Sequence, residues 1–156
     1  MDLKLETICA LATGSGIGAI AVVRISGADS RKILSQCFFK DLSQVQSHTI
    51  HFGTISSKEG VQIDEVLVSY FAHGRSFTGE ESIEVSCHGS PYVQQQILAV
   101  LQQCGCRMAE PGEFTKRAFI NGKLDLSQAE AVADLIAAQS KKAHRIALSQ
   151  LKGNLS

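Results

Sequence analysis

The sequence predicts an α+β fold, with a mixed β-sheet and flanking helices, followed by a long helix. From Thr7 to about Glu110 the chain consists of short apolar runs separated by turn residues, whereas the part after Pro111 is helical and rich in alanine. Strands therefore precede helices instead of alternating with them, which favours a mixed sheet over a doubly wound fold. A length of 156 residues suits one domain, or one domain and part of another.

Two apolar runs, residues 7–12 and 19–25, are expected to form strands on either side of the glycine-rich segment Gly14–Gly18. This segment lacks the glycine spacing of a dinucleotide-binding loop, and a strand rather than a helix follows it. No G-x-x-x-x-G-K-[ST] sequence occurs, so the chain is not expected to hydrolyse nucleoside triphosphates. A flexible turn between paired strands is favoured, and a phosphate cradle is the alternative.

The middle of the chain carries further elements at the spacing of a sheet with crossing helices. Ser90 as N-cap and Pro91 at the first helical position begin a helix that Gly105 can end in a left-handed conformation. Before it we expect, in chain order, a helix near residues 29–38, strands at 49–55 and 66–71 joined by a turn at 57–60, and a strand at 83–87.

The C-terminal part is expected to be helical. Residues 114–120 form a helix that Asn121 and Gly122 end, and the pattern from Ser127 to Glu130 is a capping box for a helix reaching about Leu151. The apolar stripe of this last helix has little in the chain to pack against, which indicates a bundle whose other helices are missing or come from a second copy. We therefore expect two domains, residues 1–120 and 121–156.

Composition excludes several function classes. Fifteen basic and 15 acidic residues give no net charge, so the chain lacks the basic surface of an autonomous nucleic-acid binder. No apolar run approaches the roughly 18–20 residues that span a bilayer, and the start of the chain mixes charges, so a cytoplasmic protein with no membrane partner is expected.

The five cysteines have no disulfide spacing and are expected to be thiols. No C-x-x-C pair occurs, so no metal site is expected.

Three charged residues occupy informative positions. Arg24 lies in an apolar strand, Glu84 alternates with apolar neighbours, and Lys123 follows the break after the first C-terminal helix. Each alone is typical of a solvated charge. Together they would line a polar pocket in which a carboxylate accepts paired N–H donors and the cations bind anionic groups. His88 has two interpretations, an active-site base and, more simply, a strand-end imidazole bonded to backbone.

Four motifs carry a resemblance to a known family. They are SFTGEESIEVSCHG at residues 76–89, PGEFTKRAFINGKLDLSQAEAVADLI at 111–136, VRISG at 23–27 and IDEVL at 63–67. These motifs closely resemble the N-terminal region of the bacterial tRNA modification GTPases of the MnmE or TrmE type. The resemblance covers essentially the whole chain.

The resemblance implies an aminomethyltransferase-like folate-binding and dimerising domain, then the start of a helical domain that a GTPase domain interrupts. The family acts in the cytoplasm with an FAD-dependent partner on tRNA. It installs an aminomethyl or carboxymethylaminomethyl group at C5 of the wobble uridine, using a tetrahydrofolate one-carbon unit, either 5-formyl- or 5,10-methylene-. GTP, Mg²⁺ and K⁺ would serve the GTPase domain, which is absent from this chain. The chain alone is therefore not expected to be catalytic, although its parent protein is a hydrolase.

By their positions in the matched motifs, Arg24, Glu84 and Lys123 correspond to folate-binding residues of the family. The family usually has Pro-Pro-Gly-Arg-Gly-Gly where this chain has residues 14–19, so Ile17 stands in place of an arginine. This departure leaves an alternative, a dimerisation scaffold with a degenerate folate site. A third hypothesis, one-carbon transfer by the chain itself, finds no activated nucleophile beside a base in the sequence.

Overall fold

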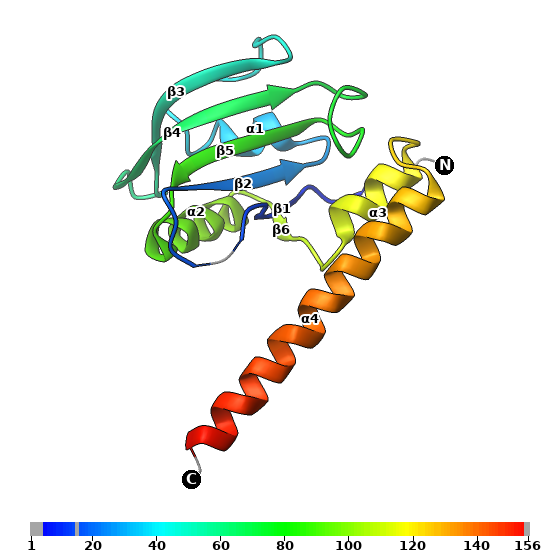
Figure 1. The fold of residues 1–156 in the computed structure, drawn as a ribbon. Coiled ribbons are helices and arrows are strands. Elements are labelled where there is room, and N and C mark those ends of the chain that lie inside the picture. The colour runs from blue at the N-terminus through cyan, green and yellow to red at the C-terminus, as the bar shows by residue number, and fades with distance from the viewer. Residues whose placement is uncertain (1–4, 15, 155–156) are drawn as a thin grey trace.

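The computed structural model describes residues 5–14 and 16–154 (Figure 1). Within them the fold is α+β, as predicted, with six strands and four helices. The strands are β1 (Ile8–Leu11), β2 (Ile20–Ser26), β3 (Thr49–Ser56), β4 (Gln62–Phe71), β5 (Ser82–His88) and β6 (Arg107–Met108). The helices are α1 (Ser30–Leu34), α2 (Pro91–Gln103), α3 (Glu113–Ile120) and α4 (Leu126–Asn154).

The strands form one mixed sheet in the order β3-β4-β5-β2-β1-β6. All neighbouring strands are antiparallel except β1 and β6, which are parallel. Side chains alternate between the two faces of each strand, so one face buries a continuous apolar layer. Fully buried members of this layer are Val23, Ile25, Val68, Ile83 and Val85.

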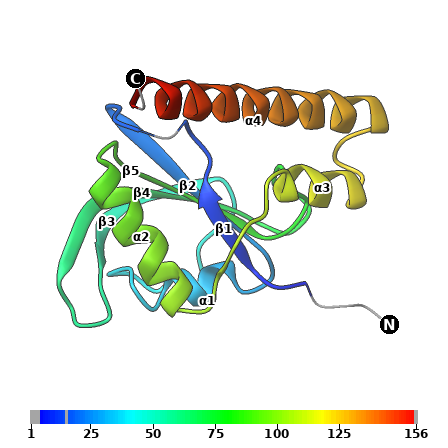
Figure 2. The same ribbon diagram turned by 90° about the horizontal axis from the view of Figure 1, so that it is seen from below.

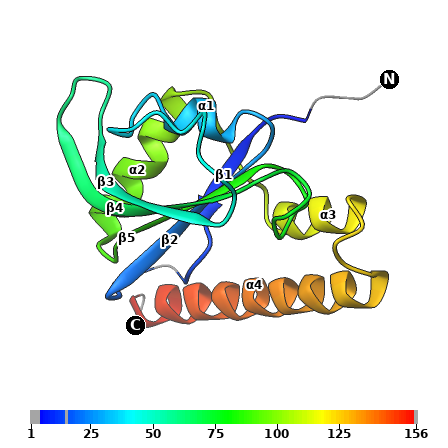
Figure 3. The same cartoon turned by 90° about the horizontal axis from the view of Figure 1, so that it is seen from above.

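Helices α1 and α2 cover this apolar face, and Figures 2 and 3 show α4 on the other side of the sheet. Ile97 and Leu101 of α2 are completely buried against the strands. The opposite face of the sheet is less covered by the described residues and exposes Ile50 and Phe52 of β3 together with Leu67 of β4. We call this second surface the open face, and it carries the candidate site.

Several predicted elements are longer or shorter than expected. Helix α1 ends at Leu34 rather than near residue 38, because the chain turns there and Phe38 forms a bridge with Ile55. Strand β4 begins at Gln62 rather than Val66 and includes the polar residues after the hairpin turn. The turn itself is confirmed: the Gly60 N–H donates to the Ser57 carbonyl at 2.9 Å.

The glycine-rich loop joins β1 to β2, which pair as predicted. Ser15 of this loop lies outside the described residues. Next to β2 the loop is in close contact with the chain after β5, since the Gly18 N–H donates to the Gly89 carbonyl at 3.0 Å. A methyl group on Gly89 would lie 2.0 Å from the Gly18 carbonyl oxygen. Only glycine permits this approach of the two backbones.

The capping box predicted at Ser127 is wrong, because α4 begins at Leu126. Asp125 precedes the helix instead, and its Oδ1 accepts from the Gln128 N–H at 2.8 Å. Gln128 Oε1 in turn accepts from the Asp125 N–H at 2.9 Å. This is the same reciprocal arrangement, with a carboxylate and an amide in place of serine and glutamate, two residues earlier than expected.

Helix α4 extends away from the sheet and packs mainly against α3 (Figure 1). Leu135 and Ile146 remain 64% and 49% exposed, so much of its predicted apolar stripe is uncovered within the described residues. No helix in the described part of the chain is both long and apolar enough to cross a membrane. The division into domains at residues 120 and 121 remains a prediction.

All five cysteines lie in the described ranges, and each is a buried free thiol, as predicted. Burial raises the pKa of Cys37 to about 12 and that of Cys87 to about 11. Because the thiolate is the reactive form of cysteine, these two side chains are packing groups rather than nucleophiles.

Candidate functional site

Arg24 and Glu84 lie directly opposite each other on the neighbouring strands β2 and β5. Both side chains are on the open face, since their neighbours in sequence occupy the buried face. Arg24 Nη2 is 3.4 Å from Glu84 Oε2, and the two side chains are 23% and 31% exposed. A single, long contact leaves part of the carboxylate free to accept hydrogen bonds from a ligand.

Two aromatic rings contact the Arg24 guanidinium. Its central carbon lies 5.0 Å from the ring centre of Phe77, in the loop between β4 and β5, and 5.2 Å from that of Phe114 in α3. Both distances are within the range of a cation–π interaction. The position of Arg24 therefore depends on three elements, its own strand, the loop and helix α3.

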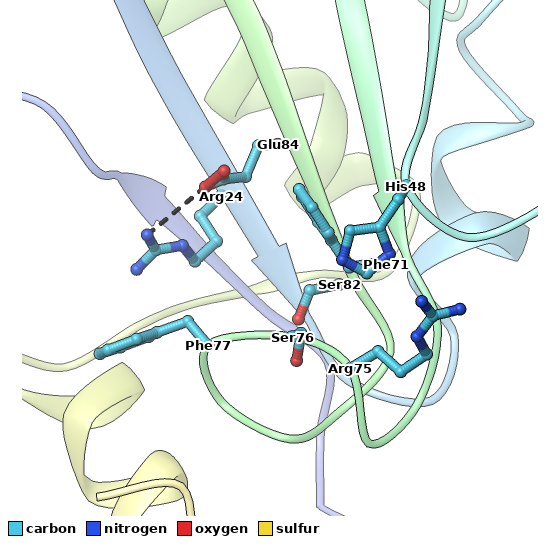
Figure 4. A pocket seen from close by; sticks show the side chains of 8 residues that line it. All are labelled: Arg24, His48, Phe71, Arg75, Ser76, Phe77, Ser82 and Glu84. Carbon is cyan, nitrogen blue, oxygen red and sulfur yellow. Dashed lines mark hydrogen bonds and ion pairs between the residues drawn. The ribbon is translucent and has the colours of Figure 1, made fainter.

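A cavity of ≈ 260 Å³ lies next to this pair. Figure 4 shows Arg24 and Glu84 on one side of it, and His48 and Arg75 on the other, with Phe71 between them. The complete lining consists of Arg24, His48, Phe71, Arg75, Ser76, Phe77, Ser82 and Glu84. The cavity thus offers one carboxylate, two guanidinium groups, an imidazole and flat apolar rings.

His48 has an unusual backbone conformation, with φ of 64°. Its Nδ1 is 2.8 Å from the Ser47 hydroxyl, and its ring meets Phe71 edge to face at 5.1 Å between centres. Non-glycine residues seldom adopt a positive φ, and such residues gather at functional sites. These contacts hold the imidazole at the side of the cavity.

Lys123 lies outside the cavity lining. It follows α3, and its ammonium group donates to the Gly74 carbonyl, at the start of the loop that supplies Arg75 and Phe77. The structure thus brings Arg24 and Glu84 together, whereas Lys123 contacts the adjoining loop at Gly74. In the described chain no hydrogen bond or ion pair joins Lys123 to either of them.

His88 also lies away from the cavity, at the far end of β5. Its Nδ1 is 2.8 Å from Asp64 Oδ1, and its backbone N–H donates to Asp64 Oδ2 at 2.9 Å. The simpler interpretation, an imidazole bonded to backbone, is therefore wrong about the partner, which is a carboxylate. The ring is 73% exposed, and its partner comes from β4, across the strand pair.

Sequence reasoning missed His48, Phe71, Arg75 and Phe114. Phe114 lies in a quoted motif, but neither its position nor its type indicates a contact with Arg24. Nothing in the sequence distinguishes His48, whose signal is its backbone conformation. Arg75 directly precedes a quoted motif, and only the folded structure of the loop shows that it lines the cavity.

Fold and site together define an α+β domain, in which a pocket on the open face of a sheet contains an Arg–Glu pair and aromatic walls. The family model described as GTP-binding protein TrmE N-terminus matches residues 7–123. This is three quarters of the chain, and the chain belongs to that family.

Curated relatives agree with this assignment. The chain is 56% identical over 158 residues to the tRNA modification GTPase MnmE of Flavobacterium johnsoniae, a match that covers 99% of this chain and 34% of the relative. The same-named protein of Parabacteroides distasonis is 52% identical, with 97% and 34% covered. That of Bdellovibrio bacteriovorus is 53% identical, with 99% and 33% covered. The chain therefore spans about a third of the length of these relatives, and matches their N-terminal part.

Proposed function

We propose that this chain is the N-terminal part of a tRNA modification GTPase and that its cavity binds a tetrahydrofolate one-carbon derivative. The family and the names of the relatives support the first half of this proposal. The Arg24–Glu84 pair beside the cavity is the observation that supports the second half.

The chemistry of the cavity suits a reduced pterin. A pterin presents a ring N–H beside an exocyclic NH₂, and a carboxylate such as Glu84 accepts both in a paired arrangement. Phe77 and Phe71 offer flat apolar surface for the bicyclic ring. A volume of ≈ 260 Å³ is slightly below the roughly 300 Å³ at which small-molecule pockets usually begin. The cavity therefore suits the pterin end, with the rest of the folate extending outward.

Cationic groups are available for the rest of the ligand. Arg75 lies across the cavity from Glu84, where its guanidinium suits the anionic tail of a folate, and the His48 imidazole lies on the same side (Figure 4). Lys123 is retained as a third binding residue, which requires that its ammonium exchange the Gly74 carbonyl for the ligand. Either the 5-formyl or the 5,10-methylene form is compatible with these groups.

Calorimetric titration with 5-formyltetrahydrofolate tests the pocket. We expect binding to the unchanged chain and a loss of roughly 1.5–3 kcal/mol in Glu84→Gln, the usual contribution of hydrogen bonds to a charged group. Lys123→Ala is expected to weaken binding less. Glu65→Gln is the matched control, because Glu65 is an exposed glutamate of β4 outside the cavity. No binding by the unchanged chain, or equal binding by Glu84→Gln, would overturn the pocket.

The second candidate, a dimerisation scaffold with a degenerate folate site, is favoured by the exposed apolar groups of the open face. Ile50 and Phe52 are 65% and 63% exposed, and Ile17, in the altered loop, is 92% exposed. Surface of this kind is typical of protein contacts. Analytical ultracentrifugation that finds a dimer, together with calorimetry that finds no folate affinity, would select this candidate over the first.

In the parent protein, the proposed module is a homodimer in the cytoplasm that works with an FAD-dependent partner on tRNA. The reaction is addition of an aminomethyl or carboxymethylaminomethyl group at C5 of the wobble uridine. GTP, Mg²⁺ and K⁺ belong in this proposal to a GTPase domain that the chain does not contain. We assign no catalytic residue to the chain itself.

A further inference from the structure

Arg117 of α3 is a buried charge with well-defined partners. Its side chain is 3% exposed. Nη1 donates to both carboxylate oxygens of Glu80, at 3.1 and 3.2 Å, and Nη2 donates to Glu113 Oε2 at 3.2 Å. The planar fork of an arginine suits such a double contact, whereas a lysine offers a single point charge.

Glu80 belongs to the loop of residues 74–80, which we call the pocket loop because it supplies Arg75, Ser76 and Phe77 to the cavity. The Ser26 hydroxyl on β2 donates to Glu80 Oε1 at 2.8 Å, and the same hydroxyl lies 2.7 Å from the Thr78 hydroxyl. Glu80 therefore joins Arg117 on one side to the sheet and the pocket loop on the other.

The turn after α3 contacts the pocket loop as well. Asn121 Nδ2 donates to the Thr78 carbonyl at 2.8 Å, and Lys123 donates to the Gly74 carbonyl. A methyl group on Gly79 would lie 2.8 Å from Asn121 Cβ, so loop and turn are in direct contact. Gly79 also has φ of 83°, which favours glycine. Helix α3 and the pocket loop thus form one interlocked unit.

The contacts between α3 and the pocket loop affect the proposed ligand-binding groups through Arg24. Phe77 comes from the pocket loop and Phe114 from α3, and both rings contact the Arg24 guanidinium. A shift of α3 relative to the loop therefore changes the position of one ring relative to the other. The guanidinium that faces Glu84 would then lose its support.

We propose that Arg117 is a positioning residue: through Glu80 it sets the pocket loop and Phe77, and thereby the geometry of the Arg24–Glu84 pair. The proposal rests on the proposed function of the cavity, since the affected property is affinity for a folate. A buried ion pair adds little to stability compared with apolar residues of the same shape, and its better-supported use is to fix one geometry. Arg117 itself does not line the cavity.

The test uses one substitution at two arginines. Arg117→Lys keeps the charge but loses the fork, and Arg107→Lys is the matched control, since Arg107 binds the same Glu113 carboxylate without touching Glu80. Calorimetry with 5-formyltetrahydrofolate is carried out well below the unfolding midpoint of each variant. The affinity for the folate should fall about ten-fold or more in Arg117→Lys. Ten-fold is the low end of the loss of metal affinity or activity when residues that orient metal ligands are substituted. The control should bind like the unchanged chain.

A second measurement needs no ligand. The chain has no tryptophan, so Phe77→Trp introduces a single tryptophan, in the pocket loop, whose fluorescence can be followed. Acrylamide quenching should increase when Arg117→Lys is added and stay the same when Arg107→Lys is added. Equal quenching in all three proteins would overturn the positioning role, as would a lower unfolding midpoint with unchanged affinity.

Calorimetry and quenching together distinguish failure of the proposed folate site from failure of the positioning role of Arg117. If the unchanged chain binds no folate, the proposed function fails, and quenching alone decides the role of Arg117. If folate binds equally to all variants and quenching does not change, the pocket stands and the positioning role is wrong.

Discussion

Helices α2 and α4 are stabilised in opposite ways. Helix α2 buries Ile97 and Leu101 completely, yet the Ser90 side chain at its N-cap makes no capping hydrogen bond. Helix α4 has a reciprocal cap between Asp125 and Gln128 but leaves Leu135 64% exposed. One helix depends on tertiary packing, and the other on local structure.

This difference shows which part of the fold is stabilised by packing within the described residues. The sheet with α1 and α2 encloses its own core, so its stability is set by contacts within the described residues. Most helical stability in proteins comes from packing an apolar face, and α4 obtains this mainly from α3. Substitutions that act on packing should therefore affect α2 strongly and α4 weakly, whereas loss of a cap should do the reverse.

The largest expected effect is on packing. Leu101→Ala should lower the free energy of unfolding by about 2–5 kcal/mol, because the buried side chain leaves a cavity. The same substitution at Leu135 should change it by less than about 0.5 kcal/mol, as at other exposed sites. Urea unfolding followed by circular dichroism measures both. Equal losses would mean that α4 is packed in solution in a way that the structure does not contain.

A smaller effect is expected from acid at the junction between α3 and the sheet. Hydrogen bonds from Arg107 hold the pKa of Glu113 at about 2, below the ordinary 4.5. Because the folded pKa is the lower one, the stabilisation is complete above pH 4.5 and is lost as the pH falls from there toward 2. The expected loss is about 1–2 kcal/mol after allowance for screening by solvent. Urea unfolding across this window should show a steeper loss for the unchanged chain than for Glu113→Gln; parallel curves would contradict the assignment.

The smallest effect concerns the caps. Asp125→Ala removes a capping acceptor and should cost about 1 kcal/mol, whereas Ser90→Ala, which removes no side-chain cap bond, should cost a few tenths at most. Hydrogen exchange of the first-turn amides reports each helix separately. Faster exchange at the start of α2 in Ser90→Ala, with no change at α4 in Asp125→Ala, would reverse the comparison.

Much of the fold follows from the order of apolar and turn residues, but some elements depend on tertiary contacts. Strand β6 has two residues, too few to show alternation, and is defined by pairing: the Arg107 N–H donates to the Thr7 carbonyl at 3.0 Å. The prediction used only Ser127 with Glu130 for the start of α4, but Asp125 with Gln128 satisfies the spacing of a capping box equally well. The turn after α3 selects the earlier pair.

The site was predictable only in part. Alternation places Arg24 and Glu84 on the polar face of their strands, but their contact depends on the register of β2 and β5, which the whole sheet sets. Arg117 shows no signal in the sequence, because a helical arginine is usually exposed and its burial here depends on the pocket loop. The motif resemblance supplied the candidate residues, and the folded chain supplied their neighbours.

A crystal structure of the chain with 5-formyltetrahydrofolate tests the central claim most directly. We predict that the pterin lies in the cavity beside Phe77, with its N–H edge against the Glu84 carboxylate and with Arg24 next to that carboxylate. A folate bound elsewhere, such as in the apolar groove between α3 and α4 lined by Phe119 and Ile136, would contradict the claim.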